Sequence, residues 1–381
     1  MKILLLGEYS HLHNTFKKGL EALGHQVILV GDGDGFKNFP VDLSIRPKSS
    51  DSYFIKPFRK LIFKMFKFDI ALLERGLRFY FYKNQLRGFD IVQLINEKPI
   101  KTTPAFERYL LKKVFKNNTK SFLLSCGIDY LSVQFMLNKG FKYSLMNPYF
   151  ENPQVKNEFQ YIFEYTTEAH KKTHQLVYEH CKGVIATDFD YVLPLKGHPL
   201  FLGLIPNPVD CESIQQLQLK PENNIKVFLG INRGTYVKKG IPFFEKALEI
   251  LKTKYPDTLE ITIVENIPYN KYITLFDQAH ILLDQVYAYD QGYNALEAMA
   301  KGKVVFTGAE KEFLEHYKLK EDEVCINALP NVDAIVKKLS WLIENPGEIE
   351  KIGHNARAFI EREHHYIKVA ERYLESWKKV D

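Results

Sequence analysis

The stretch Leu282–Gly302, LLDQVYAYDQGYNALEAMAKG, decides the fold of this chain. An apolar run ends at Asp284, a short polar loop with Gly292 follows, and an Ala/Leu/Met-rich helix then begins. A strand, a glycine turn and a helix N-terminus form an anion site, since free backbone N–H groups and the helix dipole face the same loop. Glu297, one turn inside the helix, would repel phosphate but could accept hydrogen bonds from ribose hydroxyls. The stretch predicts a nucleotide site without a metal, and the alternative is an ordinary β-α unit with a chance acid.

Length and composition limit the classes of protein to consider. The 381 residues are enough for two domains, and 45% hydrophobic with 26% charged residues are typical of a soluble globular protein. The net charge of +6 is modest and no nucleic-acid-binding module is recognisable, so we expect no nucleic-acid partner. Four scattered cysteines indicate neither a zinc site nor a disulfide framework. No apolar run approaches ~20 residues, so we expect a cytoplasmic protein without a membrane span.

Predicted strands and helices alternate along two halves of the chain. In the first half we expect strands at 2–6, 26–30, 90–95, 120–125 and 183–187 and helices at 14–23, 104–115 and 168–181. In the second half we expect strands at 226–229, 259–264, 280–283 and 304–307 and helices at 239–253, 270–279, 295–301, 331–359 and 366–378. Such alternation predicts parallel, doubly wound sheets.

The two halves are separated by a proline-rich linker, IPNPVD (residues 205–210), which can continue neither a helix nor a central strand. We therefore predict an α/β protein of two Rossmann-like lobes, residues 1–205 and 206–364. Ligands of open α/β sheets bind at the carboxyl ends of the strands, so the site is expected in the cleft between the lobes.

The loop after the first strand of the second lobe is basic. In GINRGTYVKKG, residues 230–240, Arg233 and one of Lys238 and Lys239 precede a helix. A guanidinium and an ammonium at the carboxyl end of a strand could hold a diphosphate and stabilise the charge left on it as it departs. A solvated basic loop is the alternative.

Together with IPNPVD and GYNALEAMAKGKVVFTG (residues 292–308), this loop resembles the retaining nucleotide-sugar glycosyltransferase family of GT-B fold. The resemblance covers most of the C-terminal lobe and is thinner in the N-terminal lobe. It implies that the last helix, within 365–381, crosses back to the N-terminal lobe. It also implies that Arg233 and Lys238 or Lys239 contact the donor diphosphate and that Glu297 binds the ribose.

The chain departs from the Glu-x7-Glu motif of this family at one position. Tyr289 stands eight residues before Glu297, so the first Glu is not retained, and Asp290 or Asp284 could replace it. The Asp-Gln pair at 284–285 also resembles a bacterial branch of such enzymes. The residues expected to bind the donor are Gly7, Arg233, Lys238, Lys239, Asp284, Asp290, Gly292, Tyr293, Asn294 and Glu297.

Two loops of the N-terminal lobe offer further candidates. Gly7 would let the backbone approach the donor phosphate, and the nearby His11, His13 and Asn14 would face the acceptor, unless they only build the start of a helix. Family enzymes often carry a histidine from this lobe that contacts the donor sugar. The loop Ser125–Asp129 has none. Asp129, or alternatively the pair at 96–97, is expected instead, so the candidate catalytic residues are Arg233, Lys239 and Asp129.

The resemblance implies transfer of a sugar, from a donor such as a UDP-sugar, to a hydroxyl of a glycan or glycolipid. Bacterial surface polysaccharide or lipopolysaccharide synthesis is the expected setting. Retention of configuration is expected, with preorganised cations rather than a protein nucleophile, and neither a cofactor nor a metal. A sugar-nucleotide epimerase of similar fold and a non-catalytic binding relative are the alternatives. The base, the donor sugar, the acceptor and the oligomeric state stay open.

The segment KPFRKLIFKMFK, residues 56–67, is rich in both positive charge and apolar side chains. It holds five basic residues and no acid, with Phe, Leu, Ile and Met among them. Such a segment can lie on an anionic membrane surface. The alternative is a helix whose apolar side packs in the core of the N-terminal lobe.

Overall fold

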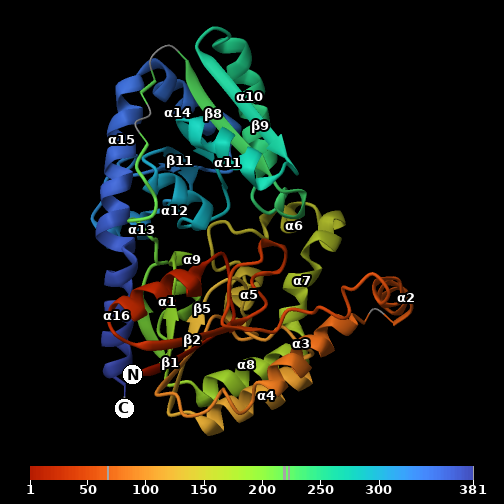
Figure 1. The fold of residues 1–381 in the computed structure, drawn as a ribbon. Coiled ribbons are helices and arrows are strands. Elements are labelled where there is room, and N and C mark those ends of the chain that lie inside the picture. Colours follow the sequence, from red (N-terminus) through yellow and green to blue (C-terminus); the bar gives the residue numbers. More distant parts are fainter. Residues whose placement is uncertain (67, 218–219, 222–223, 381) are drawn as a thin grey trace.

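Two parallel β-sheets, each flanked by helices, form the two lobes of the computed structural model (Figure 1). It describes residues 1–66, 68–217, 220–221 and 224–380. Lys67 and Asp381, the last residues of two predicted segments, lie outside the described residues, as do 218–219 and 222–223 in the predicted C-terminal lobe. Doubly wound sheets were expected in both halves, and both are present.

The N-terminal sheet has seven strands in the order β3-β2-β1-β4-β5-β6-β7. Its strands are β1 (Lys2–Leu6), β2 (Gln26–Gly31), β3 (Leu43–Ser44), β4 (Ile91–Leu94), β5 (Lys120–Ser125), β6 (Gly183–Ala186) and β7 (Phe201–Leu204). The α-helices are α1 (Leu12–Ala22), α2 (Lys56–Phe66), α3 (Ile70–Phe81), α4 (Pro104–Asn117), α5 (Tyr130–Leu137), α6 (Asn147–Glu151), α7 (Gln160–Phe163), α8 (Glu168–His180) and α9 (Phe189–Leu195). Short 3-10 helices are η1 (Gly35–Lys37), η2 (Pro153–Phe159) and η3 (Glu164–Thr166).

Strand β1 shows why the apolar runs of this lobe form buried strands. Its Leu4 and Leu6 pack in the core on one face of the sheet, while Ile3 and Leu5 pack in the core on the other face. Strands covered on both faces are apolar throughout, as parallel sheets require. The sequence missed the edge strand β7, whose residues are only half-buried and whose pairing with β6 has a register shift.

The C-terminal sheet has five strands in the order β12-β11-β10-β8-β9. Its strands are β8 (Ile225–Ile231), β9 (Leu259–Glu265), β10 (Ile281–Leu283), β11 (Val304–Thr307) and β12 (Ile326–Asn327). The helices are η4 (Arg233–Thr235), α10 (Ile241–Lys254), α11 (Tyr269–Gln278), α12 (Tyr293–Ala300), α13 (Lys311–Tyr317), α14 (Val332–Glu344), α15 (Pro346–Phe359), η5 (Ile360–His364) and α16 (Tyr366–Lys378). The strand order reverses between β8 and β10, which makes the loops after these two strands the place where a ligand is expected.

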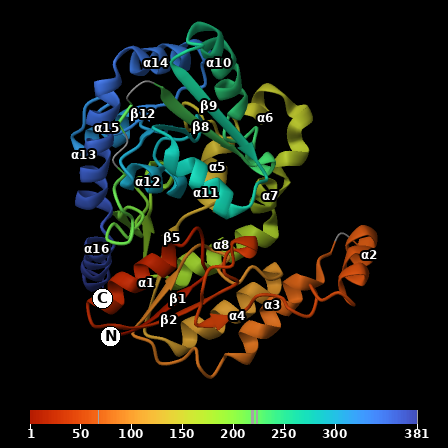
Figure 2. The same ribbon diagram turned by 45° about the horizontal axis from the view of Figure 1, so that its top comes forward.

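Helix α16 packs on α1 of the N-terminal lobe, and α15 and α16 run along one side of both lobes (Figures 1 and 2). The packing is close, since a Cβ added at Gly19 would lie 2.5 Å from the Tyr366 carbonyl oxygen. The chain therefore passes twice between the lobes, and backbone hydrogen bonds join the two connecting segments. Val209 of the linker donates its N–H to the His364 carbonyl and accepts the N–H of Tyr366, at 2.7 and 3.2 Å.

The inter-lobe segment, residues 138–167 between α5 and α8, lies at the boundary of the lobes (Figure 1). One apolar cluster extends from it into the C-terminal lobe. Phe141 and Phe159 of the segment belong to the same cluster as Leu296 and Met299 of α12. The N-terminal lobe is thus packed against the loops that follow β8 and β10. None of the described helices is long and apolar enough to cross a membrane.

Candidate active site

A cavity of about 280 Å³ is lined by residues of both lobes. The N-terminal lobe contributes the loops after β5 and β6 and part of the inter-lobe segment. The C-terminal lobe contributes Thr235, Lys238, Lys239, Gln285, Tyr287, Ala288, Asp290, Gln291 and Gly292. These residues lie in the two loops at which the strand order reverses, so the cavity is where the topology predicts a ligand.

Lys239 is held at the cavity by a buried carboxylate. Asp284, at the end of β10, accepts the Lys239 ammonium at 2.8 Å, the Asn294 amide at 3.1 Å and the Thr307 hydroxyl at 3.4 Å. The side chain of Asp284 is 1% exposed, whereas that of Lys239 is 33% exposed. An ammonium has three donors, so its bond to Asp284 leaves donors for an anion. Asp284 therefore positions the lysine and does not itself face a ligand.

Lys238 makes different contacts from Lys239. Its ammonium donates to the Glu158 carbonyl at 2.9 Å and lies over the rings of Phe159 and Tyr161, at 5.6 and 5.2 Å. Burial lowers the pKa of this lysine. The side chain thus fastens the inter-lobe segment to the loop after β8.

Six of the ten predicted donor-binding residues do not line the cavity: Gly7, Arg233, Asp284, Tyr293, Asn294 and Glu297. Arg233 pairs with Glu265 at the end of β9, at 2.7 Å, and lies over the ring of Tyr236 with its side chain 55% exposed. Glu297 pairs with Lys301 at 3.4 Å, one turn along α12. The structure therefore brings Lys238, Lys239, Asp290 and Gly292 together at the cavity and leaves Arg233 and Glu297 outside its lining.

Tyr289, at the position of the missing acid, serves the contact between the lobes. Its ring is buried beside Phe141 and Tyr143, and its hydroxyl accepts the N–H of Lys142 at 2.8 Å. The next residue, Asp290, lines the cavity instead. Of the two predicted replacements for the acid, Asp290 reaches the cavity and Asp284 is covered by its three partners.

The acidic wall, Asp188, Asp190 and Asp290, was missed in part by sequence reasoning. Asp188 caps α9 by accepting the N–H of Asp190 at 3.1 Å, and Asp190 accepts the N–H of Tyr289 at 3.3 Å. Burial, reinforced by the neighbouring carboxyls, raises the pKa of Asp188 to about 7 and that of Asp290 to about 8, and it raises the pKa of Asp190 strongly. The available signal was Thr-Asp-Phe-Asp directly after the strand predicted at 183–187.

Comparisons with known proteins agree with this geometry. Residues 235–375 match the family described as glycosyl transferase-like. The chain has the GT-B fold, and its C-terminal part is similar to glycosyltransferases. Sucrose-phosphate synthase from Thermosynechococcus elongatus is similar in structure, with a TM-score of 0.62 and 14% identity over 100% of this chain and 98% of that one.

Two further solved structures have the same fold. Anabaena HepE in complex with UDP-glucose superposes with a TM-score of 0.59 and 13% identity over 100% of both chains. UDP-GlcNAc 2-epimerase from Neisseria meningitidis, bound to UDP-GlcNAc, does so with a TM-score of 0.52 and 14% identity over 100% of both chains. No curated protein sequence matches this chain.

The remaining candidates of the N-terminal lobe form its loops and helix caps. Asp129 is 1% exposed and caps α5, where it accepts the N–H of Ser132 at 2.7 Å and the hydroxyl of Ser125. It is not among the residues that line the cavity, whereas its neighbours Gly127 and Ile128 are. Its geometry is that of a helix cap, so we omit it from the proposed catalytic groups.

The loop after β1 requires glycine at position 7. Gly7 has φ +89°, and a Cβ there would lie 2.2 Å from the Ile95 side chain. His13 bonds the Gly7 carbonyl at 2.8 Å, and burial lowers the pKa of His13 to about 3. Asn14 donates to the buried Glu8 carboxylate through its backbone and its side chain, at 2.9 and 2.7 Å. His13 and Asn14 therefore build the start of the helix, which was the alternative to contact with the acceptor.

The raised pKa of Asp290 predicts a pH-dependent stability. In the folded protein Asp290 holds a proton up to a pH of about 8, whereas the unfolded chain releases it near pH 4. This residue therefore lowers stability as the pH rises between those values. Asp290→Asn removes the effect. We expect its melting temperature, relative to wild type, to be higher at pH 8 than at pH 5. Thermal unfolding at both pH values measures this. The exposed Asp333→Asn on α14 is the control, and a shift that is equal at both pH values would contradict the assignment.

Proposed function

We propose that the enzyme transfers a sugar from a nucleotide diphosphate sugar, with UDP as the first candidate nucleotide, to a hydroxyl group. The observation that carries the proposal is the Lys239 ammonium, fixed by buried Asp284 in the cavity between the lobes. The Anabaena HepE structure holds UDP-glucose in the same fold, which supports UDP as the first nucleotide to test.

In the proposed reaction Lys239 stabilises the negative charge that develops on the departing diphosphate. Its fixed position means that little reorganisation is needed as the bond breaks. The sugar would lie against the acidic wall, where protonated carboxyls can donate and accept hydrogen bonds to sugar hydroxyls. Retention of configuration is part of the proposal, with the acceptor hydroxyl attacking from the face that the diphosphate leaves.

Arg233 and Glu297 stay in the proposal as donor-binding groups outside the cavity. The pair of Arg233 and Glu265 is exposed, and exposed ion pairs contribute little to stability. Arg233 can therefore exchange this carboxylate for a phosphate oxygen at small cost. Glu297 is 39% exposed on the first turns of α12 and is available to ribose hydroxyls.

The proposed acceptor is a glycan or a glycolipid, as in the synthesis of bacterial surface polysaccharides or lipopolysaccharide. Phe141, Leu145 and Tyr161 of the inter-lobe segment line the cavity and would supply apolar and aromatic surface for a sugar ring. We propose the cytoplasm as the compartment, with contact at the inner face of the membrane. The four cysteines are all free, which suits a reducing compartment.

Nucleotide binding and acceptor-dependent turnover test the proposal together. We expect UDP, among UDP, GDP, ADP and CMP, to raise the melting temperature most, since a ligand at about 100 times its Kd stabilises by about 2.7 kcal/mol. We also expect donor consumption to require an acceptor. Stabilisation without turnover over a panel of acceptors would favour a non-catalytic relative. No stabilisation by any nucleotide would reject the donor site.

A sugar-nucleotide epimerase is the second candidate, and the acidic wall favours it. An epimerase needs carboxylates for proton transfer at the sugar, and Asp188, Asp190 and Asp290 line the cavity. The epimerase from Neisseria meningitidis also shares the fold. Formation of an epimer from the donor without an acceptor, followed by NMR, would select this function over transfer.

A further inference from the structure

Helix α2 stands apart from the rest of the enzyme. It extends outward from the N-terminal lobe in both ribbon views (Figures 1 and 2), and none of its residues is buried. The alternative that this segment packs its apolar side in the core is therefore wrong. A helix without a buried face obtains no stability from packing, so its sequence serves another purpose.

The helix is nevertheless held in a defined place by polar contacts at its base. Arg59 donates to both carboxylate oxygens of Asp69, at 2.6 Å each, and also pairs with Asp51. Glu74 of α3 accepts three successive backbone N–H groups, those of residues 48–50, at 2.7 to 2.9 Å. A bidentate Arg–carboxylate pair fixes orientation as well as distance. The α2 arm, residues 51–66, is thus a positioned element.

One side of the α2 arm carries an exposed apolar stripe. Phe54, Phe58, Leu61 and Met65 are 88%, 60%, 51% and 64% exposed. Phe58, Leu61 and Met65, three and four residues apart, lie on one face of α2, and Phe54 precedes the helix in the same arm. Single exposed apolar residues are common, but a contiguous stripe of large ones marks an interaction surface.

A lysine stripe accompanies the apolar one. Lys56, Lys60 and Lys64 follow each other at intervals of four residues and are all exposed. Residues 56–66 contain no acid, and the one arginine is occupied by Asp69 and Asp51. The three lysines therefore present uncompensated positive charge along the helix.

We propose that the α2 arm docks the enzyme on an anionic lipid bilayer, with the apolar stripe in the interface and the three lysines at lipid phosphates. Apolar and basic faces together are what such a surface binds. A second copy of the chain fits less well, because a symmetric contact through α2 would bring two lysine stripes together. The proposal is independent of the donor site and specifies the membrane contact suggested above.

Vesicle sedimentation tests the docking directly. We expect wild type to bind vesicles that contain about one third phosphatidylglycerol and to bind pure phosphatidylcholine vesicles much more weakly, with salt reducing the difference. Each lysine at such a surface contributes about fivefold in affinity, so the triple variant K56A/K60A/K64A is expected to lose on the order of a hundredfold. The triple variant F58S/L61S/M65S is expected to lose binding as well.

The matched control is K112A/K113A/K116A, which removes the same charge from exposed positions on α4. It is expected to bind anionic vesicles far better than the α2 lysine variant. Equal losses in the two lysine variants, or equal binding to neutral vesicles, would overturn the proposal. So would a dimer of wild type, seen by light scattering, that F58S/L61S/M65S converts to monomer. Nucleotide-induced thermal shifts without vesicles, expected to be unchanged in all three variants, show separately whether the donor site is intact.

Discussion

Lys239→Ala is expected to lower kcat/KM for donor consumption by about 10²–10³-fold, the loss that follows removal of one preorganised group from a site of developing charge. The buried Asp284 would then lose its cationic partner, so the donor loop also loses a fixed contact. Steady-state donor consumption in the presence of acceptor measures the effect. The thermal shift produced by UDP is expected to shrink in the same variant.

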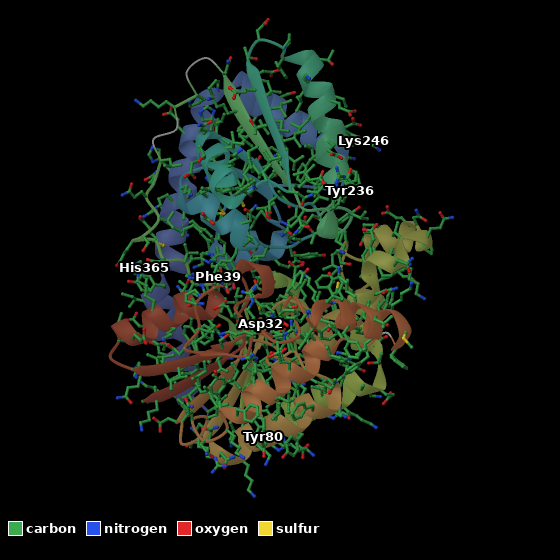
Figure 3. All side chains as sticks on the ribbon, turned by 45° about the vertical axis from the view of Figure 1, so that its right-hand side comes forward. Asp32, Phe39, Tyr80, Tyr236, Lys246 and His365 are labelled. Carbon is green, nitrogen blue, oxygen red and sulfur yellow. The ribbon has the colours of Figure 1, made fainter. Side chains whose placement is uncertain are left out.

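Two neighbouring lysines separate this role from general effects of charge. Lys246→Ala changes an exposed lysine on α10, which Figure 3 shows farther from the N-terminal lobe than Tyr236, and we expect it to have wild-type activity. Lys238→Ala removes the bond to the Glu158 carbonyl and is expected to act on stability more than on kcat. A Lys239→Ala variant within threefold of wild type, beside an inactive Lys238→Ala, would reverse the assignment.

Trp377→Ala is expected to destabilise the protein by about 3–5 kcal/mol, the usual range for removal of a large buried aromatic side chain. Trp377 of α16 is 2% exposed and packs against Phe16, Phe122 and Tyr373 in the core of the N-terminal lobe. Its indole N–H donates to the buried Gln93 at 3.2 Å. The substitution thus opens a cavity and leaves a polar group unpaired. Urea unfolding, followed by circular dichroism, measures the loss.

Two substitutions on α16 control for this prediction. Trp377→Phe keeps an aromatic ring but removes the donor to Gln93, and we expect a smaller loss of about 1–3 kcal/mol. Lys378→Ala, at an exposed position, is expected to be neutral. If Trp377→Ala were as stable as Lys378→Ala, the packing of α16 on the N-terminal lobe would be refuted.

Most elements could be predicted because their cause is local. The apolar run of β1, the strand β11 and the amphipathic helix α16 each have a periodicity that specifies their type, and the last helix was predicted at its observed bounds. The short strands β3 and β12 and the edge strand β7 could not be predicted, since their few residues pair only because a longer strand lies beside them.

The sequence predicted which loops form the candidate site better than it predicted the role of each residue in them. Asp284 and the Lys238-Lys239 pair were identified from their positions after strands, and Asp290 from the resemblance to the Glu-x7-Glu motif. All lie at or next to the cavity. Which lysine bonds the inter-lobe segment depends on Glu158, a residue 80 positions earlier whose carbonyl accepts a hydrogen bond from Lys238. No local pattern contains that information.

The amino-acid sequence by itself determined the two doubly wound sheets, their order along the chain and the acidic and basic loops between them. These follow from periodicity and from the chemistry of single segments. Only the tertiary structure decided that Asp284 holds Lys239 while Lys238 bonds the inter-lobe segment. It also decided that Tyr289 contacts the inter-lobe segment, that Asp188 and Asp190 line the same cavity as Asp290, and that no residue of α2 is buried. Each of these depends on contacts between residues far apart in the chain, where burial and partner geometry assign a side chain its role.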